Sequence, residues 1–198
     1  PEMMEIARFL AGSKMMPSHL QGDEASTFSV MLAARSLDVP MWAAFQQIIV
    51  LDGGKVGMSA TLMQALVVRA GHNLYVVDVS DGVATVRAER PRIGLDGSGS
   101  ALVTFSIDEA VKAELLVRTA DGALRARSKL NANIKKPWEK YTDDMLAWRA
   151  IGRAARRYFP DVLMGMVHTP DELGADTDEE GNPIHVDSVR MDVDEEVT

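Results

Sequence analysis

The sequence of 198 residues contains no cysteine. This absence excludes disulfide scaffolds, thiolate zinc sites and a cysteine nucleophile, and it is typical of proteins that work in a reducing compartment. The first residues lack the basic start and apolar stretch of a signal peptide, and no apolar run approaches the ~18–20 residues of a membrane-spanning helix. We therefore expect a cytoplasmic protein.

Clustered catalytic chemistry is also lacking. The four histidines lie far apart and show no His-x-x-x-His or His-plus-carboxylate spacing, so neither a metal site nor a catalytic triad has support. The turn Gly53-Gly54-Lys55 does not match a phosphate-binding loop, because that motif needs a glycine at Ile49 and a hydroxyl at Val56. We expect no cofactor, no metal and no enzymatic reaction.

Charge is present in quantity, but it is divided unevenly along the chain. The formal net charge is −8, yet residues 171–198 alone carry eleven acids against Arg190, or −10. The rest of the chain is therefore +2, and Lys112–Tyr158 holds twelve bases against five acids, or +7. A basic segment followed by an acidic one favours a polyanionic partner for the basic part. The alternative is a solvated helix face with a solubilising tail.

The hydrophobic patterns predict an α+β fold. Asp81-Gly82 is a strong hairpin signal, and Ser106 with Glu109 matches a helix capping box. We expect a small antiparallel sheet in a β-β-β-α core, with an additional N-terminal hairpin and helices packed on one face. The predicted helices are 2–12, 26–37, 60–70, 106–117 and 143–158; the predicted strands are 46–51, 56–58, 73–80, 83–89 and 101–105; residues 119–137 are predicted to be a basic loop. Residues 1–173 would form one domain, and residues 174–198 a mostly disordered acidic tail.

The helix predicted at 143–158 carries most of the functional signal. A rotation of ~100° per residue places four arginines on one arc, opposite apolar residues such as Ile151 and Phe159. We therefore expect an exposed arginine ridge, whose planar side chains suit phosphate oxygens. Upstream, lysines alternate with Trp138 and Tyr141, a combination that single-strand binders use to hold phosphates and stack on bases. The alternative for these two aromatics is that they pack at the start of the helix.

Several motifs follow one another in a distinctive order and spacing. They are Trp138-Glu139-Lys140-Tyr141 through Met145-Leu146 to Arg149-Ala150, Phe159 to Gly165, Thr169 to Leu173, and, upstream, Ile48-Ile49-Val50 with Lys55, Met58-Ser59-Ala60, Ala70-Gly71-His72 and Val103-Thr104-Phe105 into Asp108-Glu109-Ala110. With these motifs the sequence resembles the RecT/Red-beta superfamily of phage single-strand annealing proteins. The resemblance covers roughly residues 26–173 and departs from the family pattern at Thr142, where proline is common, and in a longer basic loop.

The resemblance implies annealing of complementary DNA strands without ATP, by a ring-like or helical oligomer in a bacterial host cell. The DNA would lie in a basic groove of the β-β-β-α core, and the partners would include a phage exonuclease and the host single-strand binding protein. Trp138, Tyr141 and Arg149 occupy the family's motif positions, whereas the other candidates come from the charge pattern. The candidate DNA-binding residues are Lys129, Lys135, Lys136, Trp138, Lys140, Tyr141, Arg149, Arg153, Arg156 and Arg157.

Three rival functions remain open at this point. The first is an oligomeric structural or interaction protein whose basic face pairs with protein acids rather than DNA. The second is an enzyme that uses a pocket between the sheet and the helices, which the lack of clustered His, Cys or Ser chemistry disfavours. The third is a protein that binds double-stranded DNA as well as single strands.

Overall fold

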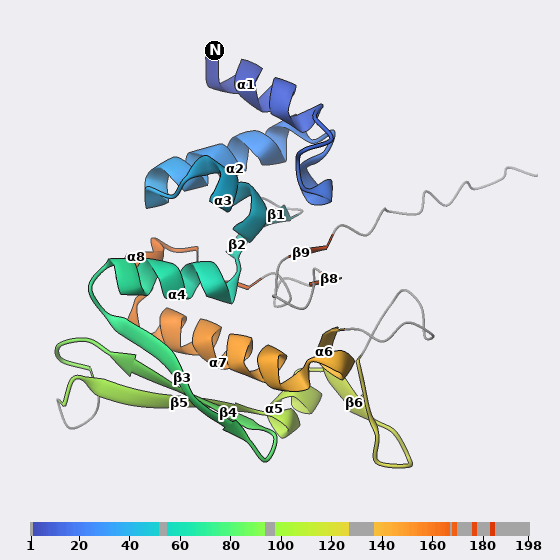
Figure 1. Ribbon diagram of the computed structural model, residues 1–198, viewed down its shortest axis with the longest axis vertical. Helices are drawn as coiled ribbons and strands as arrows, with labels where there is room; N and C mark the ends of the chain where they lie inside the picture. Colours follow the sequence, from blue (N-terminus) through green and yellow to red (C-terminus); the bar gives the residue numbers. More distant parts are fainter. Residues whose placement is uncertain are drawn as a thin grey trace, which may run out of the picture.

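The computed structural model describes residues 2–51, 55–93, 98–126, 137–166 and 168–169, and the backbone of 176–177 and 183–184. Within these residues it confirms the predicted α+β fold (Figure 1). None of the described helices is both long and apolar enough to cross a membrane. The elements are α1 (Glu2–Ala11), η1 (Ser18–Leu20), α2 (Glu24–Leu37), α3 (Met41–Gln47), β1 (Ile48–Leu51), β2 (Lys55–Met58), α4 (Ala60–Arg69), β3 (Asn73–Ser80), β4 (Val83–Glu89), β5 (Ser100–Ser106), α5 (Ile107–Lys112), β6 (Leu116–Arg118), β7 (Leu124–Ala126), α6 (Pro137–Lys140), α7 (Thr142–Tyr158), α8 (Pro160–Leu163), β8 (Asp176–Thr177) and β9 (Pro183–Ile184).

The three-stranded sheet β3-β4-β5 is antiparallel throughout. Its first turn places Asp81 and Gly82 at φ values of 50° and 71°, the left-handed conformation that a tight hairpin needs. Alternate residues of β4 are fully buried, namely Ala84, Val86 and Ala88. This inner face packs against α7, so the sheet and α7 form the β-β-β-α core that the sequence predicts.

The helix α7 is sandwiched between two layers. The sheet lies on one side of it and α4 on the other (Figure 1). Nine of the seventeen residues of α7 are buried, which is far more than one amphipathic face. The helix is therefore a central element of the fold.

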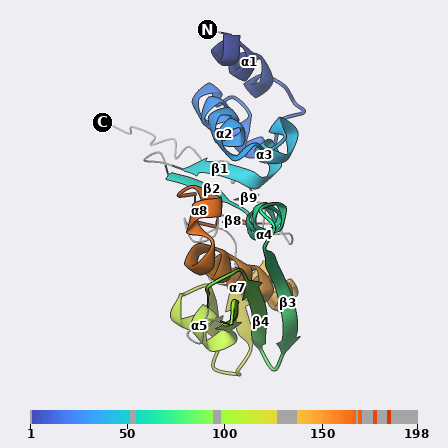
Figure 2. The same ribbon diagram turned by 90° about the vertical axis from the view of Figure 1, so that its left-hand side faces the viewer.

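The N-terminal helices form the opposite end of the molecule from the sheet. Figure 2 shows α1, α2 and α3 above the hairpin β1-β2, with α4 between this hairpin and the core. Arg69 at the end of α4 donates hydrogen bonds to the carbonyls of Leu37, the last residue of α2, and of Asp38, its C-cap. The side chain of Arg69 thereby connects the N-terminal helices to α4 and the core.

A short segment near the C-terminal end of the described chain crosses α7. The backbone N–H of Met58 donates to the carbonyl of His168 at 2.9 Å, and Gly57 pairs with His168 as an isolated parallel bridge. The next residue, Thr169, is buried over Gly152 of α7. A Cβ added at Gly152 would lie 3.0 Å from Cγ2 of Thr169, so the glycine permits this close crossing.

Two N-terminal boundaries differ from the prediction. The helix predicted from residue 26 begins at Glu24, because the Asp23 side chain accepts a hydrogen bond of 2.8 Å from the N–H of Ser26. The strand predicted from residue 46 begins at Ile48. The two preceding glutamines belong to α3, which starts directly after Pro40.

The helix predicted at 106–117 is also shorter than expected. The capping box of Ser106 and Glu109 is confirmed, but α5 ends at Lys112, and Glu114 adopts a positive φ of 59°. Residues 116–118 form β6, which pairs with β7 inside the stretch predicted to be a loop. The predicted disorder of 174–198 falls outside the described residues, apart from the backbone of β8 and β9.

The crossing of Thr169 over Gly152 predicts a coupling between these two positions. We expect Gly152→Ala to lower the free energy of unfolding by about 1 kcal/mol less in a Thr169→Ser background than in the wild type, since serine lacks the methyl group that the new Cβ would meet. Urea unfolding of the two single variants and the double variant measures this coupling free energy. Strict additivity would contradict the crossing, because alanine on its own raises helix propensity equally in both backgrounds.

Candidate nucleic-acid interface

The four arginines of α7 differ in exposure. Arg149 has only 9% of its surface exposed, Arg153 and Arg156 are half-buried, and Arg157 is exposed. The predicted external ridge is therefore wrong for Arg149. A helical wheel treats one helix in isolation, whereas the flank of α7 that carries Arg149 and Arg153 is covered by the end of β5 and by α5.

The Phe105 ring is the support for two of these arginines. The Arg149 guanidinium lies 5.9 Å and that of Arg153 4.7 Å from the ring centroid, distances at which a cation is attracted to an aromatic face. Arg153 also donates to the carbonyl of Thr104 and to Oε1 of Glu109, both at 2.7 Å. Phe105 and Glu109 thereby fix the direction in which Arg153 leaves the helix.

The ion pair between Arg153 and Glu109 is accessible to solvent. The side chain of Arg153 is 35% exposed and that of Glu109 41% exposed. An exposed pair of this kind contributes little to stability. It does lower the local positive charge, so Glu109 attenuates the attraction of this flank for anions.

A second group of basic candidates, besides the four arginines of α7, lies just before the start of this helix. Lys140 is exposed, Tyr141 is 38% exposed, and Trp138 is buried with 6% of its surface exposed. In this arrangement Trp138 packs in the core, and Tyr141 is the aromatic side chain that a base could reach. Of the ten candidates, Lys129, Lys135 and Lys136 lie outside the described residues.

Glu139 holds the two flanks of that undescribed stretch together. Its carboxylate accepts a 2.9 Å hydrogen bond from the N–H of Ala126 and pairs with Arg125 at 3.3 Å. Ala126 ends β7, and Pro137 begins α6, so the described residues on either side of positions 127–136 lie beside one another. Lys140 is the last residue of α6 and directly follows Glu139 in the sequence.

The two basic groups are at opposite ends of one helix. Lys140 precedes α7, and Arg156 and Arg157 lie in its last turn. At ~1.5 Å per residue, a seventeen-residue helix separates them by about 24 Å. The continuous groove expected from the sequence is thus two basic ends linked by the flank of Arg153.

The end of α7 that bears Arg156 and Arg157 is anchored by Arg90, which follows β4. Its guanidinium donates to the Tyr158 carbonyl at 2.7 Å and to both carboxylate oxygens of Asp161, at 2.7 and 3.1 Å. It also lies 5.5 Å from the centroid of the Phe159 ring, whose neighbour is His72 at 5.5 Å. This cluster satisfies a carbonyl of the helix end and attaches it to the sheet.

The sequence reasoning missed the residues that position the cations. Glu109 was identified as a cap but not as a partner of Arg153, and Arg90 gave no signal because its partner is 71 positions away. Phe105 sits in an apolar strand whose alternation predicts burial, which is consistent with a core role. Among the described residues, no three His, Asp or Glu side chains are grouped so that they could hold a metal ion.

The Arg90–Asp161 pair predicts a pH dependence of stability. The hydrogen bonds from Arg90 hold the pKa of Asp161 below its ordinary value, so the stabilisation is fully present above the unfolded-state pKa of about 3.9 and is lost as the pH falls through the lower folded-state pKa. We expect Asp161→Asn to lower stability by less than about 1 kcal/mol at pH 7, because the carboxylate is 60% exposed. In urea unfolding, the difference in free energy of unfolding between the wild type and this variant should shrink below pH 4. A difference that stays constant with pH would contradict the pairing.

A family comparison matches residues 92–184 to the RecT family. The segment begins just before β5 and includes α5, α6, α7 and α8, so it contains both basic ends. Searches of curated proteins and of solved structures gave no match. The resemblance of residues 26–91 and the expected domain boundary at residue 173 stay predictions. Over residues 92–184 the protein is RecT-like, and this match confirms its resemblance to the RecT/Red-beta superfamily of single-strand annealing proteins.

Proposed function

We propose that this protein binds single-stranded DNA and anneals complementary strands without ATP, in phage-type homologous recombination in the cytoplasm of a bacterial host. The observation that carries the proposal is the RecT match over residues 92–184. That segment contains the helix with the four arginines and the basic stretch before it. The phage exonuclease and the host single-strand binding protein implied by the resemblance are its proposed partners.

Annealing requires a protein that holds the sugar-phosphate chain and leaves the bases available. Cations at the two ends of α7 would contact phosphates of one strand and release its counterions. The bases would then face a second strand, which is tested by Watson–Crick pairing, so no covalent step is needed. A few cations per protomer bind weakly, and an oligomer would multiply these contacts along the strand.

The geometry suggests different roles for the ten candidates. Arg157 and Lys140 are exposed, and neither has an ion pair within the described part of the chain. We assign direct phosphate contact to these two and to Arg156, and, from the charge pattern of the sequence alone, to Lys129, Lys135 and Lys136. Tyr141 is the proposed stacking residue. Arg149 and Trp138 are buried and act as positioning residues.

We expect Lys140→Gln and Arg157→Gln each to weaken binding of a fluorescently labelled oligonucleotide of arbitrary sequence and to slow annealing of complementary strands. Each loss should reduce the slope of log affinity against log salt by about 0.7, the contribution of one phosphate contact on a single strand. Fluorescence anisotropy over a salt series and a strand-annealing assay measure the two effects. Arg8→Gln is the matched control, since this exposed arginine lies on α1 and pairs with Glu24.

Wild-type protein that does not accelerate annealing without ATP would contradict the proposal. If Arg157→Gln instead disrupts assembly in the absence of DNA, the basic face pairs with protein acids, and the rival structural function is supported. Equal affinity for duplex and single strands would favour the double-strand binder.

The pair between Arg153 and Glu109 predicts a gain of function. Glu109→Gln removes the negative charge but keeps a side chain that can complete the capping box with Ser106. We expect tighter single-strand binding at low salt with nearly unchanged stability, whereas Glu109→Ala should also lose about 1 kcal/mol of capping energy. Anisotropy and urea unfolding of both variants measure this. Unchanged affinity for Glu109→Gln would exclude the Arg153 flank from the DNA path.

A further inference from the structure

The outer face of α1 presents an apolar residue between acids. Helical spacing places Glu2, Glu5 and Phe9 on one side of α1. Phe9 has 79% of its surface exposed. Glu2 and Glu5 have no ion pair or hydrogen bond within the described residues, whereas Arg8 on another side of the helix pairs with Glu24. Isolated exposed apolar residues are common, but an aromatic ring this exposed beside two unpaired acids is a distinct surface.

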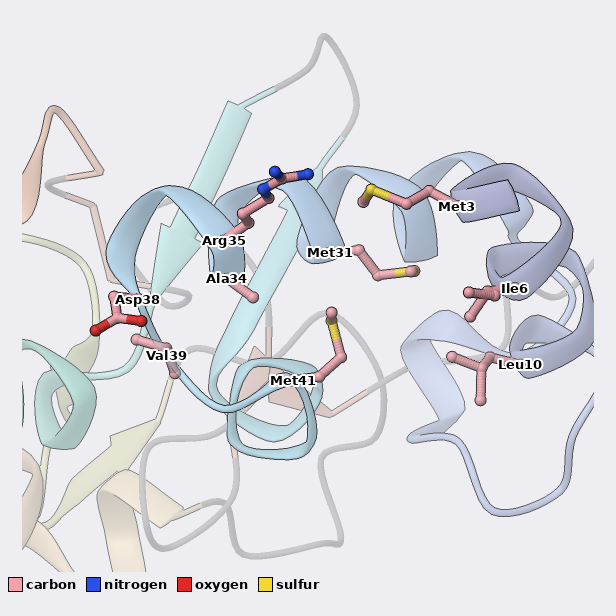
Figure 3. Close-up of a pocket in the computed structure, with 9 residues that line it drawn as sticks. All are labelled: Met3, Ile6, Leu10, Met31, Ala34, Arg35, Asp38, Val39 and Met41. Carbon is pink, nitrogen blue, oxygen red and sulfur yellow. The ribbon is translucent and has the colours of Figure 1, made fainter. Parts of the chain in front are cut away.

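A methionine-lined groove lies on the inner side of the same helix. It encloses about 420 Å³ between α1, α2 and the start of α3. Figure 3 shows Met3, Met31 and Met41 around this space, with Ile6 and Leu10 at its α1 wall. Methionine side chains are flexible and polarizable, so such a groove adapts its shape to an inserted apolar group.

The rim of the groove carries a cation. Arg35 of α2 is exposed and has no ion pair or hydrogen bond within the described part of the chain. Asp38 also lines the groove, but Figure 3 places it farther from α1 than Arg35. Arg35 therefore supplies a positive charge on the side of the groove nearer to α1.

The two surfaces are complementary but cannot meet within one chain. Because α1 forms one wall of the groove, its outer face with Phe9 points away from the cavity that its inner face lines. The acids beside Phe9 are opposite in charge to Arg35, and an aromatic ring suits the apolar groove. A second copy of the chain supplies both features at once, and a contact between two different surfaces builds a ring or an open chain.

We propose that the outer face of α1 in one molecule docks into the methionine-lined groove of a second copy, with Phe9 in the groove and Glu5 against Arg35. This inference rests on the proposed function in one respect: annealing by an oligomer needs a contact between copies of the chain. The contact lies at the end of the molecule opposite the sheet and needs no DNA (Figure 2).

Sedimentation of the full-length protein without DNA tests the apolar half of the contact. We expect wild-type protein to associate and Phe9→Asp to weaken association at least tenfold, with an unchanged circular dichroism spectrum. Met15→Asp is the matched control, because Met15 is 76% exposed but does not line the groove. A monomeric wild type, or equal loss in both variants, would overturn the proposal.

A charge exchange tests the polar half and identifies the occupant. Glu5→Arg and Arg35→Glu should each weaken self-association, and an equimolar mixture of the two should restore it, because every contact in an alternating assembly then joins unlike charges. If Arg35→Glu alone has an effect and mixing restores nothing, the occupant is the chain's own acidic segment, and the proposal fails. Assembly that behaves as expected in a protein that does not anneal DNA would refute the proposed function and leave this interface standing.

Discussion

The packing of α7 between the sheet and α4 is the constraint on which the rest of the structure depends. A helix enclosed on both sides can expose side chains only at its ends and along one narrow flank. Its arginines are consequently separated by exposure, from the buried Arg149 to the exposed Arg157. The same enclosure places the residues that hold cations, such as Phe105 and Arg90, on the surrounding elements. Fold and charge distribution are therefore set by one packing arrangement.

Local signals in the sequence were sufficient for much of this fold. The turn at Asp81-Gly82, the capping box at Ser106 and the long helix ended by Pro160 act over a few residues and were predicted at or near their positions. The strand β6 was missed because three residues have no periodicity to read. The helix α3 was missed because seven residues are too few to show a helical period, and its last two were assigned to the following strand.

The candidate site was harder to predict for a different reason. The sequence identified the cations, but their exposure depends on residues that approach from 49 positions away for Thr104 and 44 for Glu109. Such contacts leave no trace in a helical wheel. The burial of Arg149 and the separation of Lys140 from Arg157 both follow from tertiary packing, which single-element patterns do not contain.

The hydrogen bond between Glu139 and Ala126 has a consequence for the free energy of folding. It joins the end of β7 to α6, two elements that are adjacent in space although ten residues separate them in the sequence. Closing a connection costs entropy, but each doubling of its length adds only about 0.6 kcal/mol. The entropy cost of this closure is therefore insensitive to the exact number of residues between Ala126 and Pro137.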